Sequence, residues 1–484
     1  MGERGPDLVD HPLRALGDLL PREAQHPPPG EHESVLAGAV MLEGGTIAVV
    51  GAAVDRKLAI VRDTYAALHA EASGARGELL EAAIIILIVI EIVIAFQQSR
   101  RDAVCEPFAQ HVEQSPFEHI GLEDAAIEKD GGGSRRPTRM LGQILAMTQN
   151  RQWGTQGRGK TTYNYNVGRD MGGTIGMQAG STFKIFPMAA AIEAGISPFE
   201  YVPSYSPKTF SEFTNCTTGE KFAPVTVRNS TTSGTLDMAR ATAYSTNTYF
   251  MSIEERTGIC RPADIAESMG VRLANGDPLL RVPTLAIGTM EVTPLAMANA
   301  YATFAAHGMY CKPISILEMR DRDGRQMPIP TADCTRVIKR EVADTVTVML
   351  NGVVDGFIGG RTGQAMALTD RQVAGKTGTT NDSAAVWFCG YTPDVAAAVW
   401  VGDPRGGFAH PMKNVTINGT YYSQVFGGTL PGPIWKEAME TAVLGTEPIP
   451  FDIKTKWGLT TKDPGSTSTW TGSSTNTPKA EEPQ

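Results

Sequence analysis

Ser181 and Lys184 could act together as a nucleophile and its base. They stand three residues apart in the segment Gly180-Ser181-Thr182-Phe183-Lys184, and side chains at this spacing on a helix share one face. The lysine amine could take the serine proton if burial or a nearby positive charge keeps that amine neutral. The Gly-Ser-Thr start is typical of a helix N-terminus, whose free N–H groups could face a developing oxyanion. The alternative interpretation is a helix cap followed by a solvated lysine.

Two motifs further along the chain could supply partners for this pair. Tyr244-Ser245-Thr246-Asn247 offers a hydroxyl and a side-chain amide, and Gly375-Lys376-Thr377-Gly378-Thr379 offers a second lysine, two hydroxyls and a glycine. The order Ser-x-x-Lys, Ser-x-Asn, Lys-Thr-Gly resembles the transpeptidase domain of penicillin-binding proteins, most closely the bifunctional class A type of actinobacteria. The resemblance runs from about residue 125 to about residue 444.

Three flanking segments extend the resemblance beyond the motifs. They are Gly142-Gln143-Ile144-Leu145-Ala146-Met147, Ile287-Gly288-Thr289-Met290-Glu291-Val292-Thr293-Pro294-Leu295 and Gly427-Gly428-Thr429-Leu430-Pro431-Gly432-Pro433-Ile434-Trp435. Bifunctional members also carry a glycosyltransferase domain before the transpeptidase, and we expect none here because the sequence shows neither room nor motifs for it. Residues 129–140 look like an insertion between two strands. Whether the N-terminal part is a natural fusion or a chimera stays open.

The resemblance implies catalytic roles for three residues. Ser181 would be the nucleophile, Lys184 the general base for acylation, and Ser245 the relay that passes the proton to the leaving amine. Asn247 would hydrogen-bond the substrate's acyl-side amide. Lys376 would add positive charge that helps to keep Lys184 neutral.

The Lys-Thr-Gly strand would also bind substrate. Thr377 and Thr379 would hold a substrate carboxylate, and Gly378 would let the strand approach the substrate closely. The backbone N–H groups of Ser181 and Thr379 would form the oxyanion hole, in which one donor is typically worth about 2.7–4 kcal/mol.

The implied reaction is D,D-transpeptidation of peptidoglycan through a serine acyl-enzyme. Stem peptides ending in D-Ala–D-Ala would be the substrates, and β-lactams would bind covalently in their place. The alternatives are a D,D-carboxypeptidase, a serine β-lactamase or a non-enzymatic β-lactam sensor. Fast lactam hydrolysis usually needs an added base, and no Glu-x-x-Leu-Asn-type text lies between Asn247 and Lys376. We expect no cofactor and no metal ion.

Composition is ordinary for a globular protein. The chain has 484 residues, a net charge of −9 and 42 % hydrophobic residues, which argues against a general nucleic-acid binder. The six cysteines form no C-x-x-C pair. Cys311–Cys334 and Cys216–Cys260 could be disulfides in an exported domain; the alternative is buried free thiols.

The N-terminal part predicts a membrane anchor. Residues 1–53 are uncharacterised, 54–78 carry the apolar spacing of a coiled-coil-like helix, and 79–98 contain an apolar run about long enough to span a bilayer. Glu91 lies inside that run and should be protonated or face another helix. The alternative is a buried strand or core helix. We expect a single-pass protein of the cell membrane with an extracytoplasmic catalytic domain, and an oligomer formed through residues 54–96.

The remaining boundaries follow from pattern and composition. Residues 99–124 are a linker, 125–445 the transpeptidase domain, and 446–484 a disordered tail. The fold class is α+β, similar to the penicillin-binding transpeptidases and serine β-lactamases, with an antiparallel sheet flanked by helices. Strands are expected at 125–128, 143–147 and 373–380, a hairpin at 384–392 and 395–401, and helices after Ser181 and at 236–256, 295–307 and 341–353.

Overall fold

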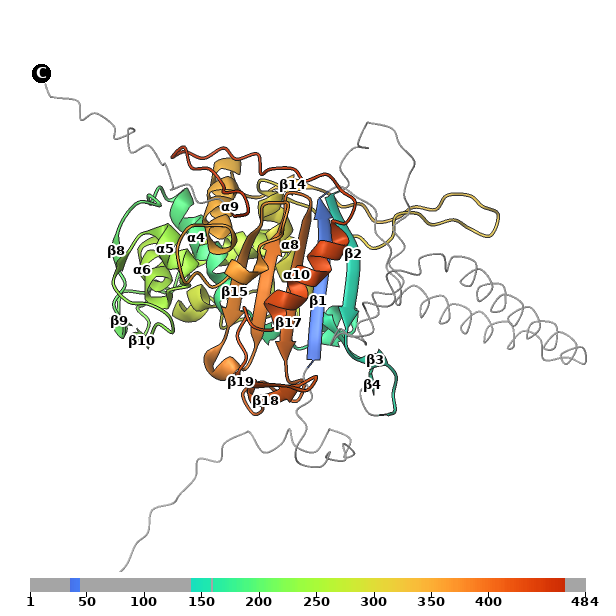
Figure 1. Ribbon diagram of the computed structural model, residues 1–484, viewed down its shortest axis with the longest axis horizontal. Coiled ribbons are helices and arrows are strands. Elements are labelled where there is room, and N and C mark those ends of the chain that lie inside the picture. Colours follow the sequence, from blue (N-terminus) through green and yellow to red (C-terminus); the bar gives the residue numbers. More distant parts are fainter. Residues whose placement is uncertain (1–34, 44–140, 158–159, 466–484) are drawn as a thin grey trace, which may run out of the picture.

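A central antiparallel sheet organises the domain. A computed structural model describes residues 35–43, 141–157 and 160–465 (Figure 1). Five strands lie in the order β15-β16-β17-β1-β2, and every neighbouring pair is antiparallel. The sheet strands are β1 (Val35–Glu43), β2 (Leu141–Gln149), β15 (Ala374–Thr379), β16 (Val386–Tyr391) and β17 (Val395–Gly402).

The other elements surround this sheet. The α-helices are α4 (Ile185–Glu193), α5 (Met238–Ala243), α6 (Asn247–Thr257), α7 (Cys260–Ser268), α8 (Pro294–Ala305), α9 (Arg340–Val354) and α10 (Pro431–Ala442). The 3-10 turns are η1 (Arg169–Met171), η2 (Gly180–Lys184), η3 (Pro283–Ile287), η4 (Gln364–Met366) and η5 (Asn381–Ser383). The short outer strands are β3 (Gln152–Trp153), β4 (Lys160–Thr161), β5 (Asn164–Gly168), β6 (Gly173–Thr174), β7 (Met177–Gln178), β8 (Val202–Pro203), β9 (Lys208–Phe210), β10 (Val225–Val227), β11 (Thr235–Leu236), β12 (Glu291–Val292), β13 (Met309–Tyr310), β14 (Thr335–Arg336), β18 (Lys413–Ile417) and β19 (Thr420–Gln424).

Alternation along β16 separates two hydrophobic cores. Trp387, Cys389 and Tyr391 belong to the larger core with α4, α6 and α8, whereas Val386 and Phe388 belong to a smaller core with α10. Helix α10 crosses the front of the sheet in Figure 1. Each face of the sheet is therefore covered by helix, which buries all six residues of β16.

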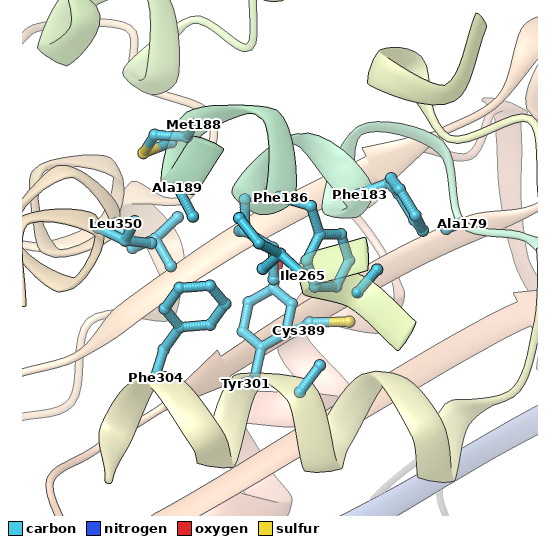
Figure 2. Packing of buried hydrophobic residues seen from close by; sticks show 14 of the residues in the cluster. Ala179, Phe183, Phe186, Met188, Ala189, Ile265, Tyr301, Phe304, Leu350 and Cys389 are labelled. Carbon is cyan, nitrogen blue, oxygen red and sulfur yellow. The ribbon is translucent and has the colours of Figure 1, made fainter. Parts of the chain in front are cut away.

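The helix that follows Ser181 is buried on all sides. Eight of the nine residues of α4 are buried, and Phe186 packs against Phe304 of α8 with ring centroids 6.5 Å apart (Figure 2). The helix ends at Glu193 with Ala194 as its C-cap, and Gly195 takes the left-handed conformation expected of a C′ glycine. The helix that follows Ser181 is thus anchored in the main core.

Strand β1 comes from the segment that the sequence left uncharacterised. It lies between β17 and β2, with Glu43 opposite Leu141. The expected strand at 125–128 lies outside the described residues, as do the expected helices at 54–78 and 79–98. Within the described ranges, no helix is long and apolar enough to span a membrane.

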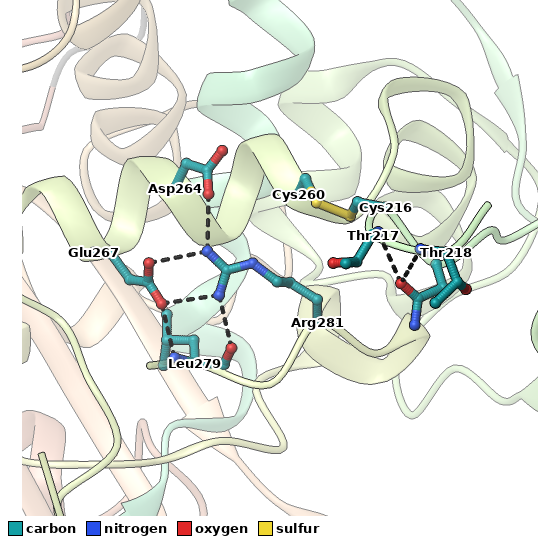
Figure 3. Close-up of a disulfide and its surroundings, with 9 residues drawn as sticks. Cys216, Thr217, Thr218, Cys260, Asp264, Glu267, Leu279 and Arg281 are labelled. Atoms are coloured by element: carbon teal, nitrogen blue, oxygen red, sulfur yellow. Dashed lines mark hydrogen bonds and ion pairs between the residues drawn. A yellow bond between two sulfur atoms is a disulfide. The ribbon is translucent and has the colours of Figure 1, made fainter. Parts of the chain in front are cut away.

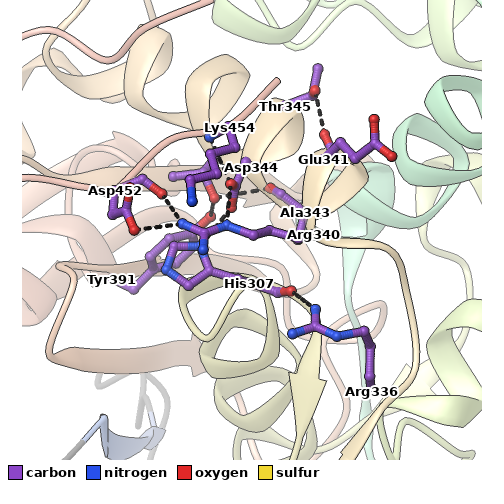
Figure 4. Close-up of polar contacts among 11 residues, drawn as sticks. His307, Arg336, Arg340, Glu341, Ala343, Asp344, Thr345, Tyr391, Asp452 and Lys454 are labelled. Atoms are coloured by element: carbon purple, nitrogen blue, oxygen red, sulfur yellow. Dashed lines mark hydrogen bonds and ion pairs between the residues drawn. The ribbon is translucent and has the colours of Figure 1, made fainter. Parts of the chain in front are cut away.

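The described part of the C-terminal segment is packed, not disordered. Phe451 is buried, and Lys454 N donates to Asp344 Oδ2 at 2.8 Å. Figure 4 shows that Asp344 and Arg340 of α9 bind this segment. Arg340 donates hydrogen bonds to the backbone oxygen and to a carboxylate oxygen of Asp452. The expected disordered tail from residue 446 is therefore wrong for residues 446–465, because buried polar groups of α9 fix them.

Helix prediction failed around Ser245, whereas the other core elements are confirmed. The expected helix at 236–256 is divided into α5 and α6 by a turn. The strand at 373–380, the hairpin at 384–401 and helices α8 and α9 lie where the sequence places them.

Both expected cysteine pairs are disulfides in the structure. Cys216 is bonded to Cys260 at the start of α7, beside the ion pairs of Arg281 (Figure 3). Cys311 is bonded to Cys334. Among the described cysteines, Cys389 remains as a buried free thiol.

Candidate active site

Ser181 lies in a tight turn whose backbone is fixed by a second segment. Gly180 adopts a left-handed conformation with φ +55°, and its N–H donates to Gly288 O at 2.9 Å. A Cβ at Gly288 would lie 2.0 Å from Gly180 O, so only glycine permits this approach. Ser181 itself is half-buried at the surface of the turn. The turn that carries Ser181 is therefore held by a contact with a glycine more than a hundred residues downstream.

Lys184 is completely buried beneath the turn and is hydrogen-bonded by the second motif. Its Nζ donates to Ser245 O at 2.6 Å and to Asn247 Oδ1 at 2.7 Å, and lies 3.2 Å from Ser245 Oγ. Burial, and secondly the positive charge of Lys376, holds the pKa of Lys184 well below its usual range. A neutral amine has two N–H groups, which these two carbonyl acceptors use, and its lone pair is left to accept a proton.

Lys376 reaches the same hydroxyl from the sheet. Its Nζ donates to Ser245 Oγ at 2.7 Å and to Thr377 O at 3.1 Å. Burial lowers the pKa of Lys376 to about 7. The two lysines thus converge on Ser245, Lys184 from η2 and Lys376 from β15.

Ser245 is presented by a strained turn, not by a helix. It has φ +57°, a region that residues other than glycine occupy only where the surroundings impose it. Its N–H donates to Thr242 O, and Thr246 N donates to Ala241 O, which closes the end of α5. The break between α5 and α6 turns the serine toward both lysines.

Asn247 holds two segments of the site together. Its Oδ1 accepts from Lys184, and its Nδ2 donates to Arg228 O at 2.9 Å. Nδ2 carries a second proton, which remains available to a substrate carbonyl. The expected contact with a substrate amide is compatible with this geometry.

Gly378 has a different neighbour from the one expected. A Cβ at this position would lie 2.8 Å from Ala179 O and 2.9 Å from Thr182 Cγ2. The glycine therefore lets β15 approach the nucleophile turn, whereas the sequence interpretation assigned the close approach to the substrate. A Cβ at Gly180 would in turn lie 3.3 Å from Thr379 N, so the two backbones that carry the expected oxyanion donors are in contact.

The two threonines of the strand are not equivalent. Thr379 Oγ1 accepts from Gly427 N at 3.1 Å, so its own proton is free to bind a carboxylate. Thr377 is 7 % exposed, and its hydroxyl donates to Thr362 Oγ1 at 2.9 Å. The geometry thus suits Thr379 for substrate binding better than Thr377.

Three residues near the site had no assigned role in the sequence interpretation. Gly288 and Gly427 lie in the flanking segments quoted above, which were the available signal. Thr362 lies in no motif, and its contacts became apparent only in the structure. Within the described ranges, no group of His, Cys, Asp and Glu could hold a metal ion.

Comparison with known proteins decides the family. The model of the penicillin-binding protein transpeptidase domain matches residues 141–410, more than half of the chain. The chain belongs to this family. The match contains all three motifs and both lysines of the site.

Relatives share this domain over part of their length. Penicillin-binding protein 1A of Mycobacterium tuberculosis is 32 % identical over 307 residues, which cover 58 % of this chain and 34 % of the relative. Penicillin-binding protein 1A of Aquifex aeolicus is 34 % identical over 170 residues, or 35 % of this chain and 22 % of the relative. The chain thus spans about a third or less of these relatives. Among solved structures, the penicillin-binding protein PonA1 of Mycobacterium tuberculosis aligns with a TM-score of 0.51 and 27 % identity, over 67 % of this chain and 81 % of that chain.

Proposed function

We propose that this chain is a peptidoglycan D,D-transpeptidase that works through an acyl-enzyme on Ser181. The observation that carries the proposal is the convergence of Lys184 and Lys376 on Ser245, beside a serine held in a rigid turn. Both amines have lowered pKa values because they are buried, and one neutral amine is what activation of a serine requires.

Acylation uses each group once. The Lys184 amine takes the Ser181 proton as Oγ attacks the carbonyl of the penultimate D-Ala. The N–H groups of Ser181 and Thr379 stabilise the oxyanion. The C–N bond then breaks, and the leaving D-Ala amine receives a proton through the Ser245 hydroxyl, which Lys376 contacts. The products are a Ser181 ester and free D-Ala.

Transfer reverses the proton path. The amine of a neighbouring stem peptide attacks the ester carbonyl and gives its proton to Lys184. The ester C–O bond breaks, Ser181 Oγ regains a proton, and a new amide cross-links the two peptides. Before D-Ala leaves, the Thr379 hydroxyl would bind the terminal carboxylate of the donor, and the second Nδ2 proton of Asn247 would bind an amide carbonyl on the acyl side of the donor.

The disulfides support an extracytoplasmic location for the catalytic domain. Cys216–Cys260 and Cys311–Cys334 persist in oxidising compartments, and the proposed substrate lies there as well. The proposed partners are stem peptides, β-lactams and the membrane surface. No cofactor takes part in the proposed reaction.

Slow deacylation is expected to separate this enzyme from a β-lactamase. Hydrolysis of the ester needs a second base on its far side. Between Asn247 and Lys376, three buried carboxyl groups have other surroundings than the ester. Asp344 binds Arg340, Asp355 accepts from Val373 N, and Glu254 lies within the core. Loss of about 4 kcal/mol of deacylation catalysis slows that step roughly a thousandfold.

The test is covalent labelling by penicillin, measured as intact mass. Wild-type protein should gain one adduct that persists for minutes to hours, Ser181→Ala should gain none, and the matched exposed-serine variant Ser211→Ala should label like wild type. An adduct on Ser181→Ala would place the nucleophile elsewhere. Nitrocefin turnover of many per second, lost in Ser181→Ala, would instead establish a β-lactamase. With a D-Ala–D-Ala peptide, release of D-Ala without transfer to an added amine would establish a carboxypeptidase.

A further inference from the structure

Thr362 connects the strand that carries Lys376 with the helix that precedes Ser245. Thr377 Oγ1 of β15 donates to Thr362 Oγ1 at 2.9 Å. Thr362 in turn bonds to Ala243 O, from its N–H at 3.0 Å and from its Oγ1 at 3.3 Å. Ala243 is the last residue of α5, two residues before Ser245.

This contact supplies hydrogen-bond donors to a carbonyl group at the end of helix α5, that of Ala243. The last carbonyls of a helix lack intrahelical partners, and Ala243 O finds its donors in Thr362. The strained Ser245 turn begins immediately afterwards, and such a conformation persists only when surrounding contacts determine it. Thr362 is therefore one of the contacts that fix where the Ser245 hydroxyl lies.

We infer that Thr362 is a positioning residue that holds Ser245 at hydrogen-bond distance from Lys376. Two bridges join β15 to the turn: the direct bond from Lys376 Nζ to Ser245 Oγ, and the chain from Thr377 through Thr362 to Ala243. No group in the Thr377–Thr362–Ala243 bridge takes part in the reaction. This bridge nevertheless sets the distance between β15 and the turn at which Lys376 Nζ bonds to Ser245 Oγ. The inference rests on the proposed function for its kinetic consequence.

The local packing makes the hydroxyl testable by itself. A Cβ at the neighbouring Gly363 would lie 2.8 Å from Val353 Cγ1, and one at Gly428 would lie 3.0 Å from Thr362 O. The backbone around Thr362 is therefore closely confined. Valine has nearly the shape of threonine without the hydroxyl, so Thr362→Val removes the bridge from Thr377 while the backbone contact from Thr362 N to Ala243 remains.

The experiment compares acylation by a fluorescent penicillin in Thr362→Val and Thr362→Ser. Misplacement of a reacting group by about 1 Å can cost a hundredfold in rate. We expect the acylation rate constant of Thr362→Val to fall about tenfold or more, with non-covalent affinity within about threefold, and Thr362→Ser to stay within about threefold of wild type. The matched control is Thr226→Val, which removes a hydroxyl from the Thr209–Thr226 pair of 2.8 Å on β9 and β10 and should leave acylation unchanged.

Two further measurements exclude a general loss of structure. Thr377→Val removes the same bridge from its other end, so the double variant Thr362→Val/Thr377→Val should be little slower than the slower single variant. Amide exchange at residues 244–247 should speed up in Thr362→Val and not in Thr362→Ser. If Thr362→Val does not fold, Thr377→Val carries the same comparison.

The outcomes distinguish the inference from the proposed function. Acylation of Thr362→Val at the wild-type rate would overturn the inference, and so would equal impairment of Thr362→Ser, because the methyl contact rather than the hydroxyl would then matter. Absence of penicillin labelling in the wild type would instead defeat the proposed function. The exchange measurement would still test the Thr362 bridge in that case.

Discussion

Removal of the buried Glu254 carboxyl should stabilise the domain, and increasingly so as the pH rises. Glu254 lies on α6, one turn beyond Phe250, whose ring lies 5.4 Å from Lys184 Nζ. Glu254 is completely buried, and neither carboxyl oxygen has a hydrogen-bond partner among the described residues. Burial raises the pKa of Glu254 well above its ordinary value of 4.5; the backbone of Ala286 offsets part of the rise without closing a hydrogen bond.

The sign of the pH dependence follows from where the proton is held. The folded carboxyl keeps a proton that the unfolded chain releases above its ordinary pKa. The contribution to stability is therefore lost as the pH rises from the unfolded pKa toward the folded one. The loss is about 1.4 kcal/mol per pH unit for as long as the folded carboxyl stays protonated, so a comparison of pH 5.5 with pH 7 tests its direction. The buried, unpaired polar group costs about 1–3 kcal/mol in addition.

Urea denaturation at both pH values, with the disulfides intact, measures these terms. The buried lysines have lowered pKa values, so their contribution to the free energy of unfolding rises with pH, opposite to that of Glu254. The quantity to compare is therefore the difference in this free energy between variant and wild type at each pH. Glu254→Gln cannot ionise, so its advantage in unfolding free energy over wild type should grow from pH 5.5 to pH 7. Glu254→Leu should show the same growth together with a constant gain. An advantage of Glu254→Gln that is equal at both pH values would refute the reasoning.

Three further predictions concern stability. Burial raises the pKa of Asp355 to about 7 from 3.8, so its contribution falls as the pH rises from about 4 to about 7, and the thermal melting of Asp355→Asn should lose that part of the pH dependence. Asn351→Ala should cost about 2–3 kcal/mol in urea and speed proteolysis within residues 446–465, because its amide binds Lys462 N and O; unchanged proteolysis would contradict this. Reduction of Cys311–Cys334, whose separation is 23 residues, should lower stability by about 3 kcal/mol; peptide mapping that finds both thiols free in protein from an oxidising compartment would contradict the pairing.

The motifs predicted the family and the meeting of Lys184, Ser245, Asn247 and Lys376, and regular periodicity predicted most of the core. Lys376 lies on the expected strand, and α8, α9 and the hairpin of β16 and β17 follow their apolar patterns because those patterns reflect burial against the sheet. The apolar run after Ser181 also predicted a buried helix, which is α4. These features depend on local sequence and on one dominant core.

What the sequence could not show depends on contacts between distant segments. The pattern of residues 236–256 is helical throughout, yet Ser245 breaks it, because tertiary contacts from Lys184, Lys376 and Thr362 hold the turn. Gly378 looks the same in sequence whether substrate or Ala179 lies against it. Strand β1 was missed because nine residues of strand pattern do not identify their partners.

The two lysines explain why the site needs a rigid turn at Ser245. Both amines are removed from water, and like charges in one buried site cannot both be protonated. Burial lowers the pKa of both amines, well below its usual range for Lys184 and to about 7 for Lys376. In the proposed mechanism, the neutral Lys184 amine acts as the base. The Ser245 hydroxyl lies 3.2 Å from Lys184 Nζ and 2.7 Å from Lys376 Nζ, and it can relay a proton to the leaving amine only if its position is fixed. The bridge from Thr377 through Thr362 to Ala243 supplies that constraint.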